Sequence, residues 1–263
     1  MIFTVFFTCI ALGSLVGFLA GLLGIGGGLL VVPALAYLLP LLGVEYSIVM
    51  PMALGTSLAA IVVTSSSAAY AHHRNSNIPW HLAKPLMVMV SLGALMGAFI
   101  ADFMSTQALK LFFAIVVILL ASYMLISIAK PKEKTLPSTL TLQVISWITG
   151  IVASLMGMAG GAILVPVLTY YGMSIRHAIG IATICGVLVA LFGSLGYVFI
   201  GFSQPLLPKW SAGYVYLPAL IGIVISSSFF APVGVKYASK LPVKTLKKGF
   251  AVFLILVAIN MMT

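Results

Sequence analysis

Two stretches of the chain decide its fold: GFLAGLLGIGGGLLVVPALAY at residues 17–37 and GIVASLMGMAGGAILVPVLTY at residues 150–170. At a constant offset of 133 residues, ten of the 21 aligned positions are identical, including a Gly-Gly pair and a proline a few residues later. Further along, the offset becomes 127 and pairs Thr56 with Thr183. This self-similarity is typical of an internal duplication.

The composition around these stretches indicates a membrane protein. Of 263 residues, 62% are hydrophobic and only 6% are charged, whereas a soluble domain is about 25% charged. The composition therefore argues against a nucleic-acid-binding protein, a soluble enzyme and an intrinsically disordered chain. Since a helical span needs about 20 residues, the chain has room for about eight to ten membrane segments. We predict an all-α polytopic membrane protein.

Apolar runs separated by Gly, Pro and charged residues predict five helical segments on each side of a polar stretch near the middle. That stretch, residues 130–140, is expected to be a basic cytoplasmic linker between a first half, residues 1–129, and a second half, residues 141–263. The predicted segments are 2–23, 29–42, 47–71, 83–103, 108–129, 141–157, 162–171, 177–201, 213–235 and 246–262.

The distribution of positive charge indicates how the chain is threaded. If the chain reverses at each Gly cluster, 11 of the 13 Lys and Arg residues share one side, and only Lys110 and Lys209 lie opposite. If it does not reverse, the split is six to seven. Only the first arrangement fits the positive-inside rule. The two halves are then inverted repeats, with both termini on the non-cytoplasmic side of a plasma membrane, most simply a bacterial inner membrane.

The short segment 162–171 rises only about 15 Å, half of a bilayer core. We therefore expect helical hairpins that meet near the midplane with glycines at their tips, either re-entrant or fully spanning. A helix that begins in such a tip presents unpaired N–H groups and a partial positive charge to an anion. The alternative is close helix packing through small residues; the duplication of the cluster favours the anion site. Its expected residues are Gly26, Gly27, Gly28, Gly160 and Gly161.

Hydroxyl side chains near the tips are further candidates for the anion site. Thr56, Ser57 and Thr183 could donate hydrogen bonds to the oxygens of a bound anion, or they could bond between helices. Gly55 and Gly180 beside them could interrupt their helices and expose further N–H groups.

Charged and titratable residues at segment ends are candidates for gating or coupling. His72, Arg74 and His177 fall on the expected cytoplasmic side, where they could attract an anion or carry a proton, or simply form a solvated basic cluster. Asp102, at the outer end of its segment, is either an interfacial acid or a proton-coupling group. Tyr197, near the end of a segment, is expected to be an interfacial anchor rather than a ligand of the anion.

The sequence offers no pattern for catalysis or metal binding. The four His residues have no Cys or carboxylate partners at ligand spacing, and no nucleophile motif accompanies the serines. We therefore expect a protein that is not an enzyme, with no cofactor and no metal. Gly93 and Gly97 form a small-residue pair that could serve an internal contact or the face of a homodimer.

Three motifs give a specific resemblance. GLLGIGGGLLVVPAL at residues 21–35, YAHHR at residues 70–74 and MGMAGGAILVPVLTYYG at residues 156–172 resemble the TauE/SafE sulfite exporter family over almost the whole chain. This resemblance implies a secondary transporter of a small sulfur-containing anion, such as sulfite or an organosulfonate like sulfoacetate. The alternatives are an anion channel on the same fold, or a transporter of another small organic anion. The partners expected are this anion, membrane lipids and, for a coupled carrier, protons.

Overall fold

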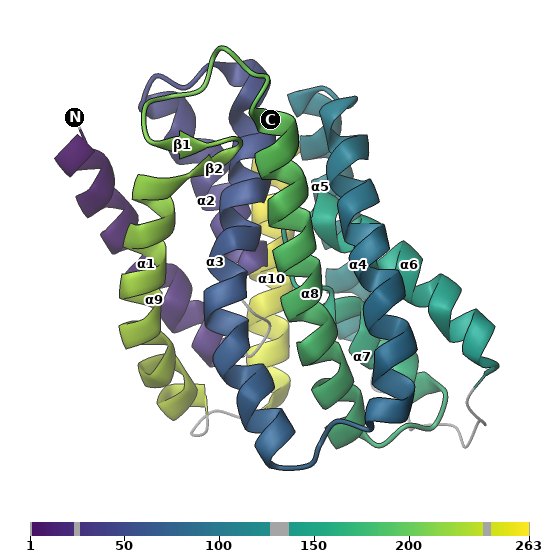
Figure 1. Ribbon diagram of the computed structural model, residues 1–263. Coiled ribbons are helices and arrows are strands. Elements are labelled where there is room, and N and C mark those ends of the chain that lie inside the picture. Colours follow the sequence, from purple (N-terminus) through teal and green to yellow (C-terminus); the bar gives the residue numbers. More distant parts are fainter. Residues whose placement is uncertain (1, 24–26, 127–136, 239–242, 263) are drawn as a thin grey trace.

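The computed structural model describes residues 2–23, 27–126, 137–238 and 243–262, and in this part the chain is almost entirely helical (Figure 1). The predicted all-α class is confirmed, and each predicted segment corresponds to one helix. The elements are α1 (Ile2–Leu23), α2 (Gly28–Leu41), α3 (Tyr46–Arg74), α4 (Trp80–Asp102), α5 (Thr106–Ile126), α6 (Thr139–Leu155), α7 (Gly161–Tyr170), α8 (Ile175–Gly201), β1 (Ser211–Ala212), β2 (Val215–Tyr216), α9 (Leu217–Ala238) and α10 (Val243–Met262).

Over the residues whose side chains are described, five helices are long and apolar enough to cross a membrane. They are α3, α4 and α8 over their whole lengths and α5 and α9 over residues 106–123 and 217–234. A helix satisfies its backbone hydrogen bonds internally, which is what a chain needs in hydrocarbon. By contrast, α2 has 14 residues and α7 has 10. At 1.5 Å per residue they are roughly 21 and 15 Å long, too short for a core about 30 Å thick.

The predicted segment 213–235 differs most from the structure. Two strands of two residues each, Ser211–Ala212 and Val215–Tyr216, form an antiparallel hairpin, and α9 begins only at Leu217. Gly213 has a φ of +54°, which turns the chain at a position where a helix would need negative φ. The hairpin lies at the upper end of the molecule in Figure 1, with both termini.

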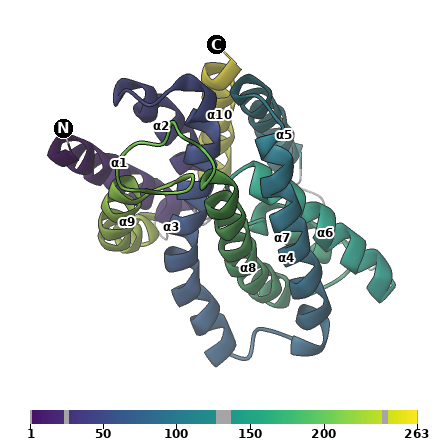
Figure 2. The same cartoon turned by 45° about the horizontal axis from the view of Figure 1, so that its top comes forward.

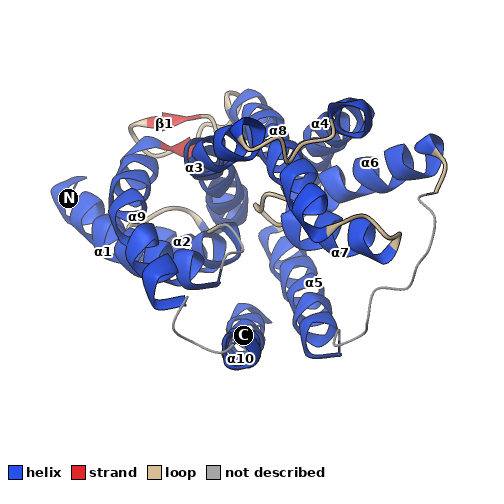
Figure 3. Ribbon diagram, turned by 90° about the horizontal axis from the view of Figure 1, so that it is seen from below, coloured by secondary structure: helices blue, strands red, loops and turns tan. Residues whose placement is uncertain are grey.

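The helices are paired across the sequence rather than in chain order. The most extensive packing joins α1 to α9 and α4 to α6, and α3 packs along α8 at the centre. Figure 2 shows α3 and α8 between the α1–α9 pair and the α4–α6 pair. The short helices pack on the central pair, α2 on α3 with α1 at its side and α7 on α8 with α6 at its side, and α5 packs along α10 (Figure 3).

The small-residue pair on α4 serves an internal contact. A Cβ atom at Gly93 would overlap the backbone carbonyl of Trp147, and one at Gly97 would lie 2.6 Å from the carbonyl oxygen of Ile151. Both glycines therefore let the backbone of α4 approach that of α6. Since this internal packing occupies both positions, any dimer face would lie elsewhere.

Candidate functional site

The start of α2 meets the Gly-rich turn between α6 and α7 inside the molecule. A Cβ atom at Gly28, the first residue of α2, would overlap the carbonyl oxygen of Gly157 and lie 2.9 Å from Cα of Met158. The same atom would lie 2.8 Å from the side chain of Ile61 on α3. Only glycine therefore fits at position 28 without moving the backbone of the other turn. Gly27 caps α2, whereas Gly26 lies outside the described residues.

The turn between α6 and α7 is built by two left-handed glycines. Gly157, with a φ of +61°, ends α6 in a Schellman motif: its N–H donates to Ser154 O at 3.2 Å, and the N–H of Met158 donates to Ala153 O at 3.0 Å. Gly160, with a φ of +71°, then caps α7. An L-residue with a side chain is disfavoured at both positions.

The first turn of α7 combines free donors with open space. Among the described residues, no hydrogen bond uses the backbone N–H of Gly161 or Ala162. A Cβ atom at Gly161 would meet nothing within 4 Å. Two unpaired N–H groups at the positive end of a helix dipole, next to room for a guest, form an arrangement that can bind an anion.

The hydroxyl of Ser57 bonds to the second Gly-rich turn, and that of Thr56 bonds to the β-hairpin. Both residues are fully buried on α3. Ser57 Oγ donates to Gly157 O at 2.8 Å, and Thr56 Oγ1 accepts from the N–H of Tyr216 at 2.9 Å. Each hydroxyl therefore ties α3 to a distant segment. Thr183, which is half-buried, donates to Ile179 O of its own helix at 2.8 Å.

The expectation that Gly55 and Gly180 interrupt their helices is wrong, because α3 and α8 are continuous through both positions. These glycines instead permit close contacts. A Cβ atom at Gly55 would lie 3.0 Å from Cβ of Tyr197, and one at Gly180 would overlap the carbonyl of Asn77.

Tyr197 and Ser154 are buried beside the second tip, and neither was predicted as a site residue. Tyr197 is 1% exposed, and its hydroxyl donates to Ser154 O at 3.3 Å. Its predicted role as an interfacial anchor is therefore wrong. Ser154 Oγ is fully buried and makes no hydrogen bond to any described residue.

The candidate gating residues lie at helix ends, away from the tips. Arg74 and His177 are exposed, at the end of α3 and the start of α8, and Nδ1 of the half-buried His72 lies 3.3 Å from Nδ2 of Asn77. Arg74 is 17 residues beyond Ser57 on the same helix, or about 25 Å at 1.5 Å per residue. Among the described residues, no three His, Cys, Asp or Glu side chains are grouped as metal ligands.

Asp102 ends α4 at the opposite side and is bonded to the β-hairpin. Its Oδ1 accepts a hydrogen bond from the hydroxyl of Tyr214 at 3.3 Å. Burial of the phenol and the nearby negative charge of Asp102 raise the pKa of Tyr214 to about 12. Tyr214 therefore stays a protonated donor at neutral pH.

Comparisons with known proteins agree with this helical membrane architecture. A "probable membrane transporter protein" of Haemophilus influenzae is 44% identical over 261 residues, covering 98% of both chains. Proteins with the same description from Methanocaldococcus jannaschii and Bacillus subtilis are 27% and 28% identical, covering 90% and 91% of this chain and 88% and 92% of their own. No solved structure gives a significant match. The family described as Sulfite exporter TauE/SafE matches residues 9–261. This multi-pass membrane protein therefore belongs to the TauE/SafE sulfite exporter family.

Proposed function

We propose that the protein is a secondary transporter that moves a small sulfur-containing anion, sulfite or an organosulfonate such as sulfoacetate, by alternating access. The observation that carries the proposal is the contact between Gly28 and Gly157, next to the open space and free N–H groups at Gly161. Fixed backbone dipoles can bind an anion and release it again. They also avoid a charged side chain at the membrane centre, which costs about 2.5–3.5 kcal/mol on an insertion scale.

Alternating access requires two parts that move relative to each other, and we propose that the inverted repeat supplies them as two related bodies, one around α1 and α9 and the other around α4 and α6. In the duplicated chain, α1 to α5 of the first half correspond in order to α6 to α10 of the second. The packing supports the proposal, because each contact between two helices recurs between their two counterparts. Thus α1 on α9 corresponds to α6 on α4, and α2 on α3 corresponds to α7 on α8. The α3–α8 and α5–α10 contacts each join a helix to its own counterpart. This is the pattern expected of inverted repeats around a site at the membrane midplane.

We propose that the end with the α3–α4 connection faces the cytoplasm of a bacterial cell, and that both termini lie on the other side. Arg74 ends α3, Arg176 is in the first turn of α8, and Lys236 is in the last turn of α9. These helix ends lie at the lower side of Figure 1, opposite to the N- and C-terminal labels. Lys110, near the start of α5, belongs to the other end, where it lies 5.0 Å from the ring centroid of Tyr46. This bias follows the positive-inside rule.

Coupling to protons would use one of the titratable groups at the helix ends. His72 and His177 are at the proposed cytoplasmic end, and Asp102 is at the opposite end with Tyr214. Because Asp102 is hydrogen-bonded to a phenol that stays protonated, a change in its charge would alter the anchoring of the β-hairpin. If the Asp102→Asn variant still takes up the anion but its uptake no longer depends on an imposed pH gradient, the result would support coupling at this carboxylate.

Transport by purified protein in liposomes tests the proposal. Liposomes loaded with unlabelled sulfite or sulfoacetate should accumulate the labelled anion saturably and faster than empty ones, as expected of a carrier. Single-channel currents without this trans-stimulation would indicate an anion channel instead. A preference for carboxylates over both sulfur anions would reject the substrate class. Gly161→Val, which fills the open space, should abolish uptake, whereas Gly249→Ala, also in open space but on α10, should not.

A further inference from the structure

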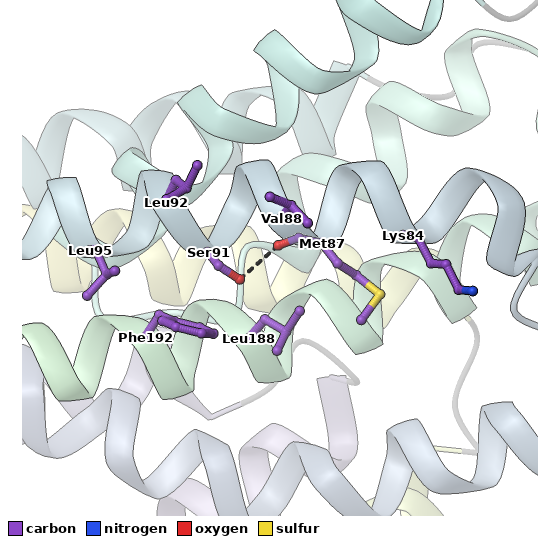
Figure 4. Close-up of a pocket in the computed structure, with 8 residues that line it drawn as sticks. All are labelled: Lys84, Met87, Val88, Ser91, Leu92, Leu95, Leu188 and Phe192. Carbon is purple, nitrogen blue, oxygen red and sulfur yellow. Dashed lines mark hydrogen bonds between the residues drawn. The ribbon is translucent and has the colours of Figure 1, made fainter.

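A groove of about 560 Å³ runs between α4 and α8 on the outside of the bundle (Figure 4). Its walls are apolar, with Val88 and Leu95 from α4 and Leu188 and Phe192 from α8. The one hydroxyl in the wall, Ser91 Oγ, donates to Met87 O at 2.8 Å and is thus already bonded. An anion such as sulfite would lose its hydration here without gaining polar partners, so the groove is not a substrate site.

The groove has one closed end and one charged end. At the closed end a Cβ atom at Gly196 would lie 2.7 Å from Cβ of Ala98, so α4 and α8 are in close contact there. At the other end is Lys84, an exposed residue in the second turn of α4. From Lys84 to Leu95 the helix rises about 16 Å at 1.5 Å per residue, which is about half of a 30 Å core. The groove therefore has the depth of one leaflet.

We propose that this groove binds one acyl chain of an anionic phospholipid, with the lipid phosphate at the ammonium group of Lys84. The apolar walls match the hydrocarbon chain, and the leaflet depth matches its length. Lysine stems extend along apolar surfaces while the charge stays at the headgroup level. The charge supplies selectivity for anionic lipids. Each basic residue at the membrane surface raises the affinity for a lipid with net negative charge about fivefold.

Native mass spectrometry of the purified full-length protein tests this, with phosphatidylglycerol and phosphatidylcholine of identical acyl chains as probes. The wild type should retain one phosphatidylglycerol in preference to phosphatidylcholine. Lys84→Gln should reduce that preference about fivefold without changing phosphatidylcholine binding. Lys110→Gln, the same charge change at the opposite end, should not. Val88→Trp, at an exposed position of the wall, should block the groove and reduce binding of both lipids.

The control for the added bulk is Leu119→Trp, at a position on α5 that is 62% exposed and outside the groove. Equal lipid retention by Lys84→Gln and Lys110→Gln would overturn the assignment of the headgroup to Lys84. Wild-type lipid binding by Val88→Trp would overturn the groove as the site. A dimer mass that disappears in Val88→Trp while lipid binding persists would show that a second copy of the chain covers this face instead.

Discussion

Replacing each tip glycine by alanine should have opposite effects on stability at positions 28 and 161. In Gly28→Ala the new methyl group overlaps Gly157 O, which Ser57 Oγ already fixes at 2.8 Å. Two of the three nearest atoms are backbone, so the turn itself must move, and overpacking of this kind costs about 1–3 kcal/mol. In Gly161→Ala the methyl group meets nothing within 4 Å. Alanine then favours the helix by up to about 1 kcal/mol.

Unfolding of both variants in detergent micelles, followed by tryptophan fluorescence, measures this difference. Gly28→Ala should unfold at a lower denaturant concentration than the wild type, and Gly161→Ala at the same or a higher one. Anion uptake into liposomes should separate stability from function at position 161: alanine is expected to reduce uptake modestly, and Gly161→Leu to abolish it while the protein stays folded.

Two results would refute this reasoning. A wild-type unfolding midpoint for Gly28→Ala would mean that the start of α2 does not make the close contact at Gly157. Wild-type uptake by Gly161→Leu, in protein shown to be folded, would mean that the space beside the first turn of α7 is not occupied by the transported anion. The first result concerns the fold and the second the site, so the two ideas can fail independently.

Three further predictions concern the hairpin and the ends of the helices. Thr56→Val should lower stability by about 1–3 kcal/mol in denaturant titrations, because it leaves the buried N–H of Tyr216 without an acceptor, and Thr56→Ser should restore most of the loss. In a cysteine-free background, an impermeant maleimide added to intact cells should label Gln204→Cys but not Ser76→Cys; the reverse pattern would invert the proposed orientation. The pKa of Tyr214 in the folded protein is raised to about 12, so the contribution of this tyrosine to folding stability is complete below pH 10 and is lost as the pH rises through 12. Phenolate absorbance should show this titration in the wild type and not in Tyr214→Phe.

The helices could be predicted from the sequence because the signals for them are local. Apolar runs interrupted by Gly and Pro predicted the ten segments, and the duplicated glycines include Gly28 and Gly157, where the start of α2 touches the turn between α6 and α7. The pairing of helices was not predictable in the same way. In a membrane protein the lipid-facing and buried sides of a helix are equally apolar, so hydropathy does not say that α1 packs on α9 instead of on its neighbour α2.

The polar contacts of the site were also beyond the sequence. Thr56 and Ser57 are adjacent on α3, yet one accepts from Tyr216 and the other donates to Gly157. These partners are 160 and 100 residues away in the chain, so only tertiary packing brings them together. Tyr197 was misjudged for a related reason, since its position near a helix end suggested the interface. The β-hairpin covers that end and buries the ring beside Tyr214.

The close glycine contacts restrict how this fold can move during transport. Gly93 and Gly97 bring the backbone of α4 against α6, and Gly13 and Gly17 do the same for α1 against α9. Backbones packed this closely separate only at a large loss of van der Waals contact, so each pair is expected to move as one body. The mobile interfaces are then those between the two bodies, along α3 and α8 and where Gly28 touches the turn of the second half. The proposed anion site at Gly161 lies next to that second interface. A substrate bound there is placed to couple its own binding to the relative movement of the two bodies.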